Sequence, residues 1–437
     1  MLVRKFRYGL VSLSLLMSTA AMAQSAPLVG DISGAEFRPY PIAIPDIRVD
    51  DNADDALQTT RLALTKILRD DLDLSGVFRV LDAKSFIDTD GLASPAVRFA
   101  DWQNVGADGL VKGKLQRKGD GYVVEIFAYQ VPRQRLALER TYSEPTESLR
   151  DLGHTIADDL YRQFTGEPGV FRSQIAYVKK IRGEKQIFLM DMDGGNPRQL
   201  TKGGGLNLLP SFSPDGTQVL FTSYRYDNPD LFEVPTRGGP IKRLSQRPGL
   251  NTGAKVSPDN QSIALTLSKD GNSELYLLKR DGKMSKRLTN AWGIDTSPSW
   301  SPDGNTIAFV SSRAGNPHIY LMDSEGNQVK RLTFQGKYNQ TPAFSPRGDL
   351  IAFTARDEFN RFDIFTIHVE TGEVTRLTQD QGNNEEPSFS PNGRLITFTS
   401  TRSGSRQLWI SNLSGSHQRQ ITVGGNHSSP AWGPFRK

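Results

Sequence analysis

The sequence of 437 residues contains no cysteine. This absence excludes disulfide frameworks, cysteine-ligated zinc, iron–sulfur clusters and catalytic cysteines. Histidine is also scarce: the five histidines are scattered, and no two stand at metal-binding or triad spacing. Neither a Gly-x-Ser-x-Gly elbow nor a His-Glu-x-x-His motif occurs. We therefore predict no catalytic residue, no metal ligand and no required cofactor.

A long apolar run is missing too, because the one apolar stretch, residues 9–17, is too short to span a bilayer. It follows three basic residues and precedes an Ala-Met-Ala tripeptide that ends at Ala23, a pattern typical of signal peptides. We predict a signal peptide over residues 1–23, with cleavage between Ala23 and Gln24, and a periplasmic protein. Its removal leaves a nearly neutral chain, which gives no reason to expect nucleic acid as a partner.

A Ser-Pro-x-Gly-like tetrapeptide recurs through the second half of the chain at intervals of 44 or 45 residues. Its five copies begin at Ser213, Ser257, Ser301, Ser345 and Ser390, and a degenerate sixth copy begins at Gly433. β-branched and aromatic runs flank each turn, and four short strands fit into each repeat. A period near 44 residues with four strands predicts the blades of a β-propeller.

The two ends of the repeat array complement each other. The first second-strand run begins at Ile175 with no inner strand before it, while the last inner-strand motif, residues 430–434, has no second strand after it. We predict that residues 430–434 supply the innermost strand of the first blade. The fold class is then a multidomain protein, an N-terminal α/β domain followed by an all-β six-bladed propeller over residues 166–437.

A polar residue stands six positions before each repeated turn, at the start of each expected inner strand. The six are Asn207, Asn251, Asp295, Asn339, Asn384 and His427. Turn chemistry alone explains Asn and Asp at such places. Six in one register beside a channel favour a binding surface, to which Glu385 and Glu386 add acid. A second recurrent set, Arg225, Lys269, Arg313, Arg356 and Arg402, is interpreted as solvated loop charges.

Residues 24–165 lack the repeat and are predicted to form the α/β domain. Apolar residues at helix-face spacing indicate two helices, over residues 53–72 and 147–164. The expected strands cover residues 40–44, 77–81, 108–116, 122–131 and 136–142. A Gly-Glu-Pro-Gly tetrapeptide after Thr165 is typical of a linker.

The domain order and the blade pattern Pro-x-[Phe/Trp]-Ser-Pro-Asp-Gly-x-x-Ile-Ala-Phe resemble the TolB family of the Gram-negative Tol–Pal system. Arg38-Pro39 followed by Ile42-Ala43-Ile44-Pro45 adds to the resemblance, which covers the whole mature chain. It implies a monomeric, non-enzymatic periplasmic scaffold that supports outer-membrane integrity and constriction during cell division. The implied partners are the lipoprotein Pal at the propeller mouth, TolA at the mature N-terminus, outer-membrane proteins, and colicins as parasitic ligands.

Carried onto this sequence, the resemblance implies a Pal site on the six polar residues together with Leu250, Thr252, Thr296, Glu385 and Glu386. The implied TolA segment is residues 24–34, within which we single out Gln24, Leu28, Val29, Asp31, Ile32 and Gly34. One departure is that Lys255 and Val256 replace the usual Pro-x-aromatic motif in the third blade. Family members can hold a calcium ion in the channel, and the carboxylates here permit one.

Two other classes of function stay open at this point. A propeller hydrolase with a channel metal would need convergent carboxylates or histidines, whereas the six polar residues are mostly asparagines. A periplasmic small-ligand binding protein is compatible with the same mouth. Affinity capture from periplasm separates these two classes from a scaffold, because a scaffold would capture partner proteins.

Overall fold

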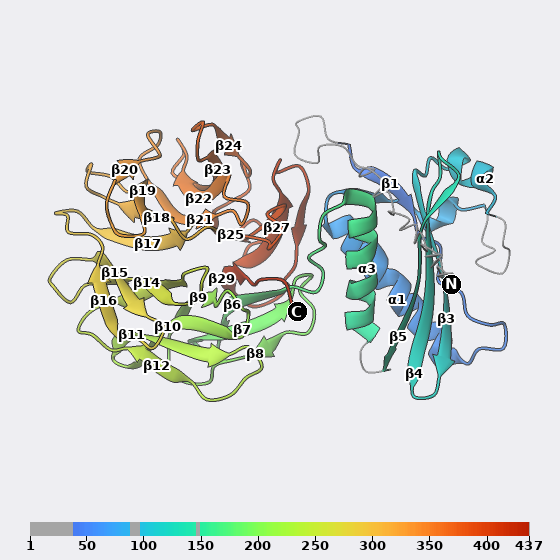
Figure 1. Ribbon diagram of the computed structural model, residues 1–437, viewed down its shortest axis with the longest axis horizontal. Coiled ribbons are helices and arrows are strands. Elements are labelled where there is room, and N and C mark those ends of the chain that lie inside the picture. The colour runs from blue at the N-terminus through green and yellow to red at the C-terminus, as the bar shows by residue number, and fades with distance from the viewer. Residues whose placement is uncertain (1–37, 88–96, 146–148, 437) are drawn as a thin grey trace, which may run out of the picture.

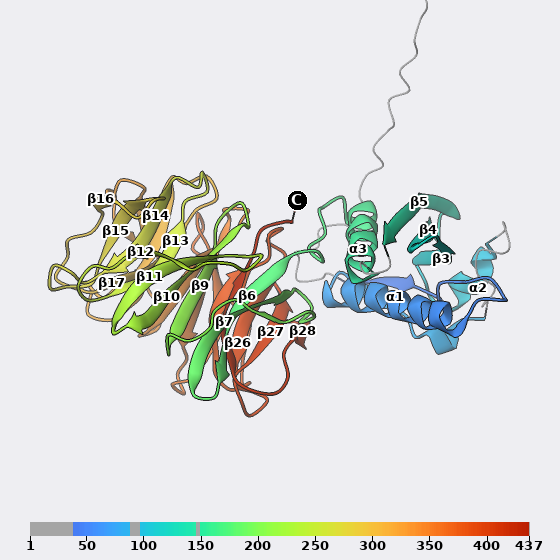
Figure 2. The same ribbon diagram turned by 90° about the horizontal axis from the view of Figure 1, so that it is seen from below.

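The computed structural model describes residues 38–87, 97–145 and 149–436. The predicted signal peptide, its cleavage position and the implied TolA segment therefore lie outside the described residues. Two bodies lie side by side, an α/β domain and a β-propeller, and helix α3 (Leu149–Thr165) lies on the side of the α/β domain next to the propeller (Figure 1, Figure 2). Among the described helices, none combines the length and apolarity needed to cross a membrane.

The α/β domain is a five-stranded sheet in the order β2-β1-β3-β4-β5. Strand β1 runs parallel to β2 and β3, and β3, β4 and β5 form an antiparallel meander. The strands are β1 (Tyr40–Ala43), β2 (Phe78–Val80), β3 (Gly109–Lys118), β4 (Gly121–Gln130) and β5 (Arg135–Pro145). The helical elements are α1 (Asp55–Leu74), the 3₁₀ turn η1 (Ala83–Ser85), α2 (Phe99–Asn104) and α3.

Helix α1 begins where Asp54 caps it, because the Asp54 carboxylate accepts the backbone N–H of Leu57 at 2.7 Å. Leu64, Leu68 and Leu72 recur at helix-face spacing and are fully buried. They belong to one apolar core that also contains residues of α3 and of the first and last blades. The two bodies are therefore joined by a continuous core as well as by the linker.

The propeller consists of six four-stranded antiparallel sheets. Blade 1 contains β29 (His427–Trp432), β6 (Gln174–Ile181), β7 (Glu184–Asp191) and β8 (Arg198–Gln199). Blade 2 contains β9 (Asn207–Phe212), β10 (Gln218–Tyr226), β11 (Asn228–Pro235) and β12 (Lys242–Ser245). Blade 3 contains β13 (Asn251–Val256), β14 (Ser262–Leu267), β15 (Glu274–Lys279) and β16 (Met284–Arg287). Blade 4 contains β17 (Asp295–Trp300), β18 (Thr306–Ser311), β19 (His318–Asp323) and β20 (Lys330–Arg331). Blade 5 contains β21 (Asn339–Phe344), β22 (Leu350–Arg356), β23 (Phe362–His368) and β24 (Val374–Arg376). Blade 6 contains β25 (Asn384–Phe389), β26 (Leu395–Ser400), β27 (Gln407–Asn412) and β28 (Gln418–Gln420).

The ring closes as predicted. Strand β29, near the C-terminus, pairs antiparallel with β6, with His427 opposite Lys179 and Trp432 opposite Ile175. The Trp432 indole N–H also donates to the Ser173 hydroxyl at 2.8 Å. The pairing gives the first blade its inner strand and removes the open edge that an incomplete sheet would expose.

The repeated tetrapeptide forms the turn between the first and second strands of its blade. In blade 4 the Ser301 hydroxyl donates to the Asp303 carboxylate at 2.5 Å, and the same oxygen accepts the Asn305 N–H at 3.1 Å. Pro302 presets the backbone bend, and Gly304 adopts a φ of 74°, which favours glycine. Local chemistry thus fixes where each inner strand ends.

The propeller channel and its mouth as the candidate functional site

The inner strands of the six blades surround a central cavity of about 520 Å³. The labels of β9, β21, β25 and β29 lie around the centre of the propeller in Figure 1. The cavity runs along these strands from their third residues to the Ser-Pro turns. It is therefore a channel along the propeller axis, with one end at the start of the inner strands.

Each inner strand contains a β-bulge, and the third residue of each strand has a positive φ between 51° and 65°. The six residues are Leu209, Gly253, Ser297, Thr341, Glu386 and Ser429, and all six line the channel. A left-handed conformation costs a non-glycine residue about 1–2 kcal/mol, so five of the six carry backbone strain. Bulges re-aim side chains, and here they direct one residue per blade at the channel. Sequence reasoning found Glu386 but missed the other five positions, because the six side chains share no chemistry.

The six polar residues predicted to ring the mouth stand in one register at the first position of each inner strand. Their side chains are buried, however, and none is more than 3% exposed. The prediction that Asn207, Asn251, Asp295, Asn339, Asn384 and His427 present themselves at the mouth is therefore corrected. Their hydrogen bonds explain why they face the protein interior.

These six residues connect neighbouring blades. The Asn207 carboxamide of blade 2 donates to the Gln186 side chain of blade 1 at 3.1 Å, and the Thr201 hydroxyl donates to the same oxygen at 2.7 Å. Thr201 in turn accepts the backbone N–H of Ile187 at 2.9 Å. A polar residue thus fills each blade boundary and makes hydrogen bonds there, as a buried polar side chain requires, although Oδ1 of Asn207 and Oδ1 of Asp295 have no partner among the described residues.

Equivalent groups recur around the ring and form what we call the inter-blade clamp. The residues within the first three positions of the third strands are Gln186, Asp230, Glu274, His318, Asp363 and Gln407. The hydroxyls after the fourth strands or at their ends are Thr201, Ser245, Thr289, Thr333, Thr378 and Thr422. Between blades 6 and 1, His427 Nδ1 lies 3.0 Å from the Gln407 side-chain oxygen, which also accepts from Thr422 at 2.8 Å. Burial lowers the pKa of His427 to about 4, so the His427 imidazole is neutral at neutral pH.

The recurrent basic residues of the second-to-third-strand loops are half-buried rather than solvated, which corrects their interpretation. Each lies over an aromatic ring of its own blade or of a neighbouring loop, with centroid distances from 4.3 Å for Arg402 over Trp409 to 5.5 Å for Arg313 over Phe309. Arg225, Lys269 and Arg356 make equivalent cation–π contacts. Burial lowers the pKa of Arg402 to about 10.

The other predicted docking residues, Leu250, Thr252, Thr296, Glu385 and Glu386, are half-buried around the start of the inner strands. Glu386 accepts hydrogen bonds from the Ser429 N–H and the Thr399 hydroxyl, at 2.7 and 2.8 Å. Glu385 pairs with Arg406 at 2.7 Å, yet burial, opposed by Arg406 and helped by Glu386, raises its pKa. These five residues, on blades 3, 4 and 6, are thus more exposed than the six polar residues of the predicted site.

The channel contains a lysine in the third blade, where the other blades have small residues. The equivalents of Lys255 are Ser211, Ser299, Ala343, Ser388 and Ala431, all of which line the cavity. Among the residues described, Lys255 makes no ion pair, and burial lowers the pKa of its ammonium group. Glu386 is the only carboxylate in the described lining. One carboxylate and an ammonium do not fit calcium, which takes about six to eight oxygen ligands.

Exposed apolar side chains gather on the loops at the mouth end of the propeller. These loops are the second-to-third-strand loops and the crossings between blades, which open at the same end because the strands of each blade alternate in direction. The exposed residues there are Leu206, Leu209, Tyr224, Tyr226, Trp292, Ile294, Phe334, Phe359 and Val423. Trp292 is 78% exposed and Phe334 is 72% exposed. Exposed apolar side chains at one end of a propeller make that end a candidate interaction site.

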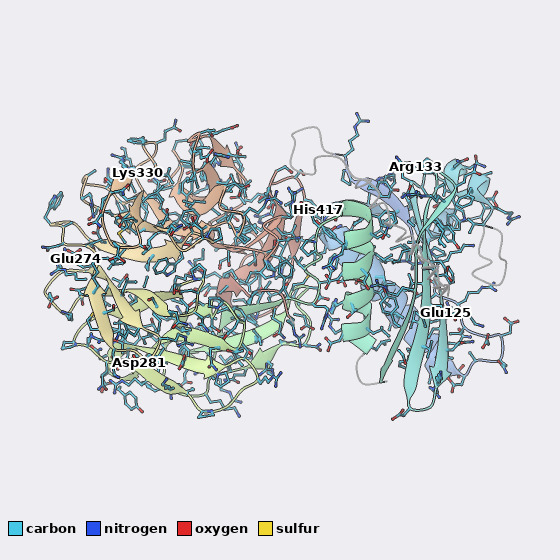
Figure 3. The ribbon with its side chains drawn as sticks, viewed as in Figure 1. Glu125, Arg133, Glu274, Asp281, Lys330 and His417 are labelled. Carbon is cyan, nitrogen blue, oxygen red and sulfur yellow. The ribbon has the colours of Figure 1, made fainter. Side chains whose placement is uncertain are left out.

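The α/β domain packs against the opposite end of the propeller. Glu167 of the linker accepts a 2.8 Å hydrogen bond from Arg394, which follows the Ser-Pro turn of blade 6, and Arg150 of α3 donates at 3.1 Å to Asp191 of blade 1. His417, in the last turn of blade 6, lies between the two bodies (Figure 3). The mouth is therefore left accessible by the α/β domain.

Three comparisons with known proteins agree with this architecture. The family described as TolB beta propeller domain matches residues 161–436, and the TolB amino-terminal domain matches residues 29–137. The chain is 46% identical over 222 residues to the Tol-Pal system protein TolB of Myxococcus xanthus strain DK1622, covering 50% of each protein. The protein of that name from Anaeromyxobacter dehalogenans strain 2CP-1 is 41% identical over 226 residues, covering 51% of each. The chain thus spans about half the length of the curated relatives it matches.

A solved structure matches over most of the chain. The crystal structure of TolB from Acinetobacter baumannii has a TM-score of 0.80 at 29% sequence identity, and the match covers 91% of this chain and 97% of that one. Both the propeller and the domain before it are therefore shared with one protein of known structure. The chain belongs to the TolB family.

Proposed function

We propose that the protein is a non-enzymatic periplasmic scaffold of the Tol–Pal system that supports outer-membrane integrity and constriction during cell division. Membership of the TolB family supports this proposal, as do relatives that bear the name Tol-Pal system protein TolB. The scaffold connects an outer-membrane lipoprotein, Pal, to the inner-membrane protein TolA. Outer-membrane proteins and colicins are further ligands of the same kind.

Pal binds at the propeller mouth. The single observation that carries this assignment is the gathering of exposed apolar side chains at the end of the propeller that the α/β domain leaves accessible. Leu250, Thr252, Thr296, Glu385 and Glu386 contact the partner at the centre of this surface. The buried inter-blade clamp does not touch Pal; it holds the inner strands that carry these residues in register.

A segment of the partner enters the channel between the bulge residues. The unpaired Lys255 ammonium then meets an oxygen-rich group at the tip of that segment, because a half-buried cation without a counter-charge gains most from one that arrives with a ligand. The bulge residues donate and accept hydrogen bonds along the way. This path uses the feature that distinguishes the third blade from the other five.

TolA binds the extreme N-terminus of the mature chain, residues 24–34. In the sequence this segment precedes β1, a strand of the α/β domain, whereas the mouth belongs to the propeller, so the two partners engage different parts of the chain. Coupling between them requires a partner with different affinities for two states of the protein. The continuous core between the domains supplies a physical connection for such coupling.

The mouth assignment is tested with purified Pal and matched surface variants. Replacing Trp292 and Phe334 with Asp should weaken Pal binding by about tenfold or more, because exposed aromatic anchors commonly contribute over 1 kcal/mol to an interface. The control replaces Val329 and Val374 with Asp, since both are exposed apolar residues at the opposite end of the propeller. Equal loss in both variants, or loss in neither, refutes the mouth assignment.

A second candidate function is the binding of a small periplasmic ligand. The channel volume of about 520 Å³ favours it, since pockets for small molecules commonly occupy about 300–1,000 Å³. The two candidates separate in one experiment. Affinity capture from periplasm retains a protein in the first case and releases a small molecule on denaturation in the second.

A further inference from the structure

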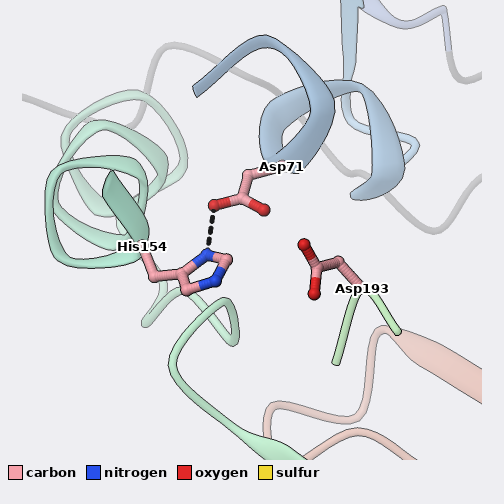
Figure 4. A group of neighbouring side chains, drawn as sticks. All are labelled: Asp71, His154 and Asp193. Atoms are coloured by element: carbon pink, nitrogen blue, oxygen red, sulfur yellow. Dashed lines mark hydrogen bonds and ion pairs between the residues drawn. The ribbon is translucent and has the colours of Figure 1, made fainter. Parts of the chain in front are cut away.

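A cluster of metal-binding side chains lies between the two domains, away from the channel. Asp71 comes from α1, His154 from α3, and Asp193 from the turn that follows β7 in blade 1. One ligand atom from each residue lies within 4.8 Å of the other two. Figure 4 shows the two carboxylates and the imidazole turned toward one shared space.

Two buried polar atoms of this cluster have no hydrogen-bond partner among the described residues. His154 is 1% exposed and Asp71 is fully buried, and their side chains meet at 2.7 Å through His154 Nδ1 and one Asp71 oxygen. His154 Nε2 and the second Asp71 oxygen, Oδ1, remain unpartnered. Leaving a buried polar atom unpaired costs about 1–3 kcal/mol, so two on facing groups indicate a ligand for both.

The charge around the cluster favours a cation. The Arg150 guanidinium donates to Asp191 at 3.1 Å and also pairs with Asp193, while Asp71 contacts His154. Three carboxyl groups and one arginine thus lie near one another in the described part of this interface. A divalent ion that displaces the protons of Asp71 and His154 would balance the carboxylate charge.

We propose that Asp71, His154 and Asp193 bind one Zn²⁺ ion that joins the α/β domain to the first blade. An imidazole nitrogen with carboxylate oxygens is a set that Zn²⁺ accepts in tetrahedral geometry, whereas calcium takes about six to eight oxygens. A carboxylate that contacts the ring of a metal-binding histidine also orients that ring. Because the ligands come from both domains, the ion fixes one domain relative to the other.

The binding test uses the tag-free mature protein after treatment with EDTA, titrated with zinc chloride against a chromophoric chelator. One Zn²⁺ per chain is expected. D193N should weaken Zn²⁺ affinity by about tenfold or more, as loss of a coordinating or supporting carboxylate commonly does. The matched control is D281N, which changes the same turn position in blade 3, far from the domain interface (Figure 3).

A second pair of variants tests the histidine. H154Q should abolish Zn²⁺ binding, while H417Q, at the same domain interface but outside the cluster, should retain it. Replacement of zinc by Co²⁺ gives a visible absorption spectrum that D193N alters even if H154Q fails to fold. The proposal is overturned if the stripped protein binds no stoichiometric zinc, or if D193N and D281N bind it equally; in that case the cluster is a hydrogen-bonded domain contact.

Discussion

The Asn384 carboxamide of blade 6 lies 2.9 Å from the Asp363 carboxylate of blade 5, to which it donates, and both side chains are buried. The Asn384 oxygen also accepts a 2.9 Å hydrogen bond from Arg402. One residue therefore joins two blades and one mouth loop. We expect N384A to lower the free energy of unfolding by about 1–3 kcal/mol, because Asp363 and Arg402 each lose a hydrogen bond to a buried side chain.

Urea denaturation followed by tryptophan fluorescence measures the effect. The control is N305A, which removes an asparagine from an exposed turn in blade 4. Surface changes of that kind usually stay within about 0.5 kcal/mol. A similar small effect for N384A would mean that the inter-blade clamp does not hold the ring together.

We expect Lys255 to lower the free energy of unfolding and to strengthen the binding of Pal. K255M removes a half-buried ammonium without a counter-charge and shortens the side chain by one heavy atom, so the free energy of unfolding should rise by about 1 kcal/mol or more. Pal binding should weaken in the same variant. K330M, which changes an exposed lysine of blade 4 (Figure 3), should alter neither quantity. Lower stability in K255M would show that the ammonium has a partner that stabilises the fold.

His427 makes stability dependent on pH. Its pKa is lowered to about 4 by burial and by Lys179, below the usual 6.5, so the unfolded chain binds the proton more tightly. Its contribution is present above pH 6.5 and is lost as the pH falls toward 4, on the order of 3 kcal/mol at most. H427N keeps a donor for Gln407 but does not titrate. Its stability should therefore fall less than that of the wild type between pH 7 and 4.5, and identical losses would contradict this role.

Deleting residues 24–34 should separate the two partners. The mature chain that begins at residue 35 should lose TolA binding and keep Pal affinity unchanged, because the proposed Pal site is made entirely by propeller residues. Surface plasmon resonance with each purified partner measures both affinities on the same samples. Retained TolA binding would place the TolA site elsewhere in the α/β domain.

The repeat carries most of the fold information in the sequence. The turns that begin at Ser213 and at its equivalents mark every blade, and the unmatched ends near Ile175 and Trp432 predict the closure that β29 makes. The helix-face spacing of Leu64, Leu68 and Leu72 likewise predicts α1. These features are periodic and local, so they can be recognised without knowing the tertiary structure.

The candidate site was predictable only in part, for two physical reasons. The register of the six polar residues followed from the repeat, but their burial depends on hydrogen bonds to the neighbouring blade, such as that from Asn384 to Asp363. The interdomain cluster brings together Asp71, His154 and Asp193 from three elements of two domains. In the sequence, His154 stands on the apolar face of a helix, where spacing reveals no partner.

The closure by β29 also has a consequence for biogenesis. Strand β29 is the last strand along this sequence, and β6, its neighbour in the sheet, is the first of the propeller. A nascent or shortened polypeptide that stops before His427 leaves β6 with an unpaired edge, the kind of surface that proteases and aggregating neighbours recognise. Residues 427–432 therefore protect the first blade from edge-to-edge association.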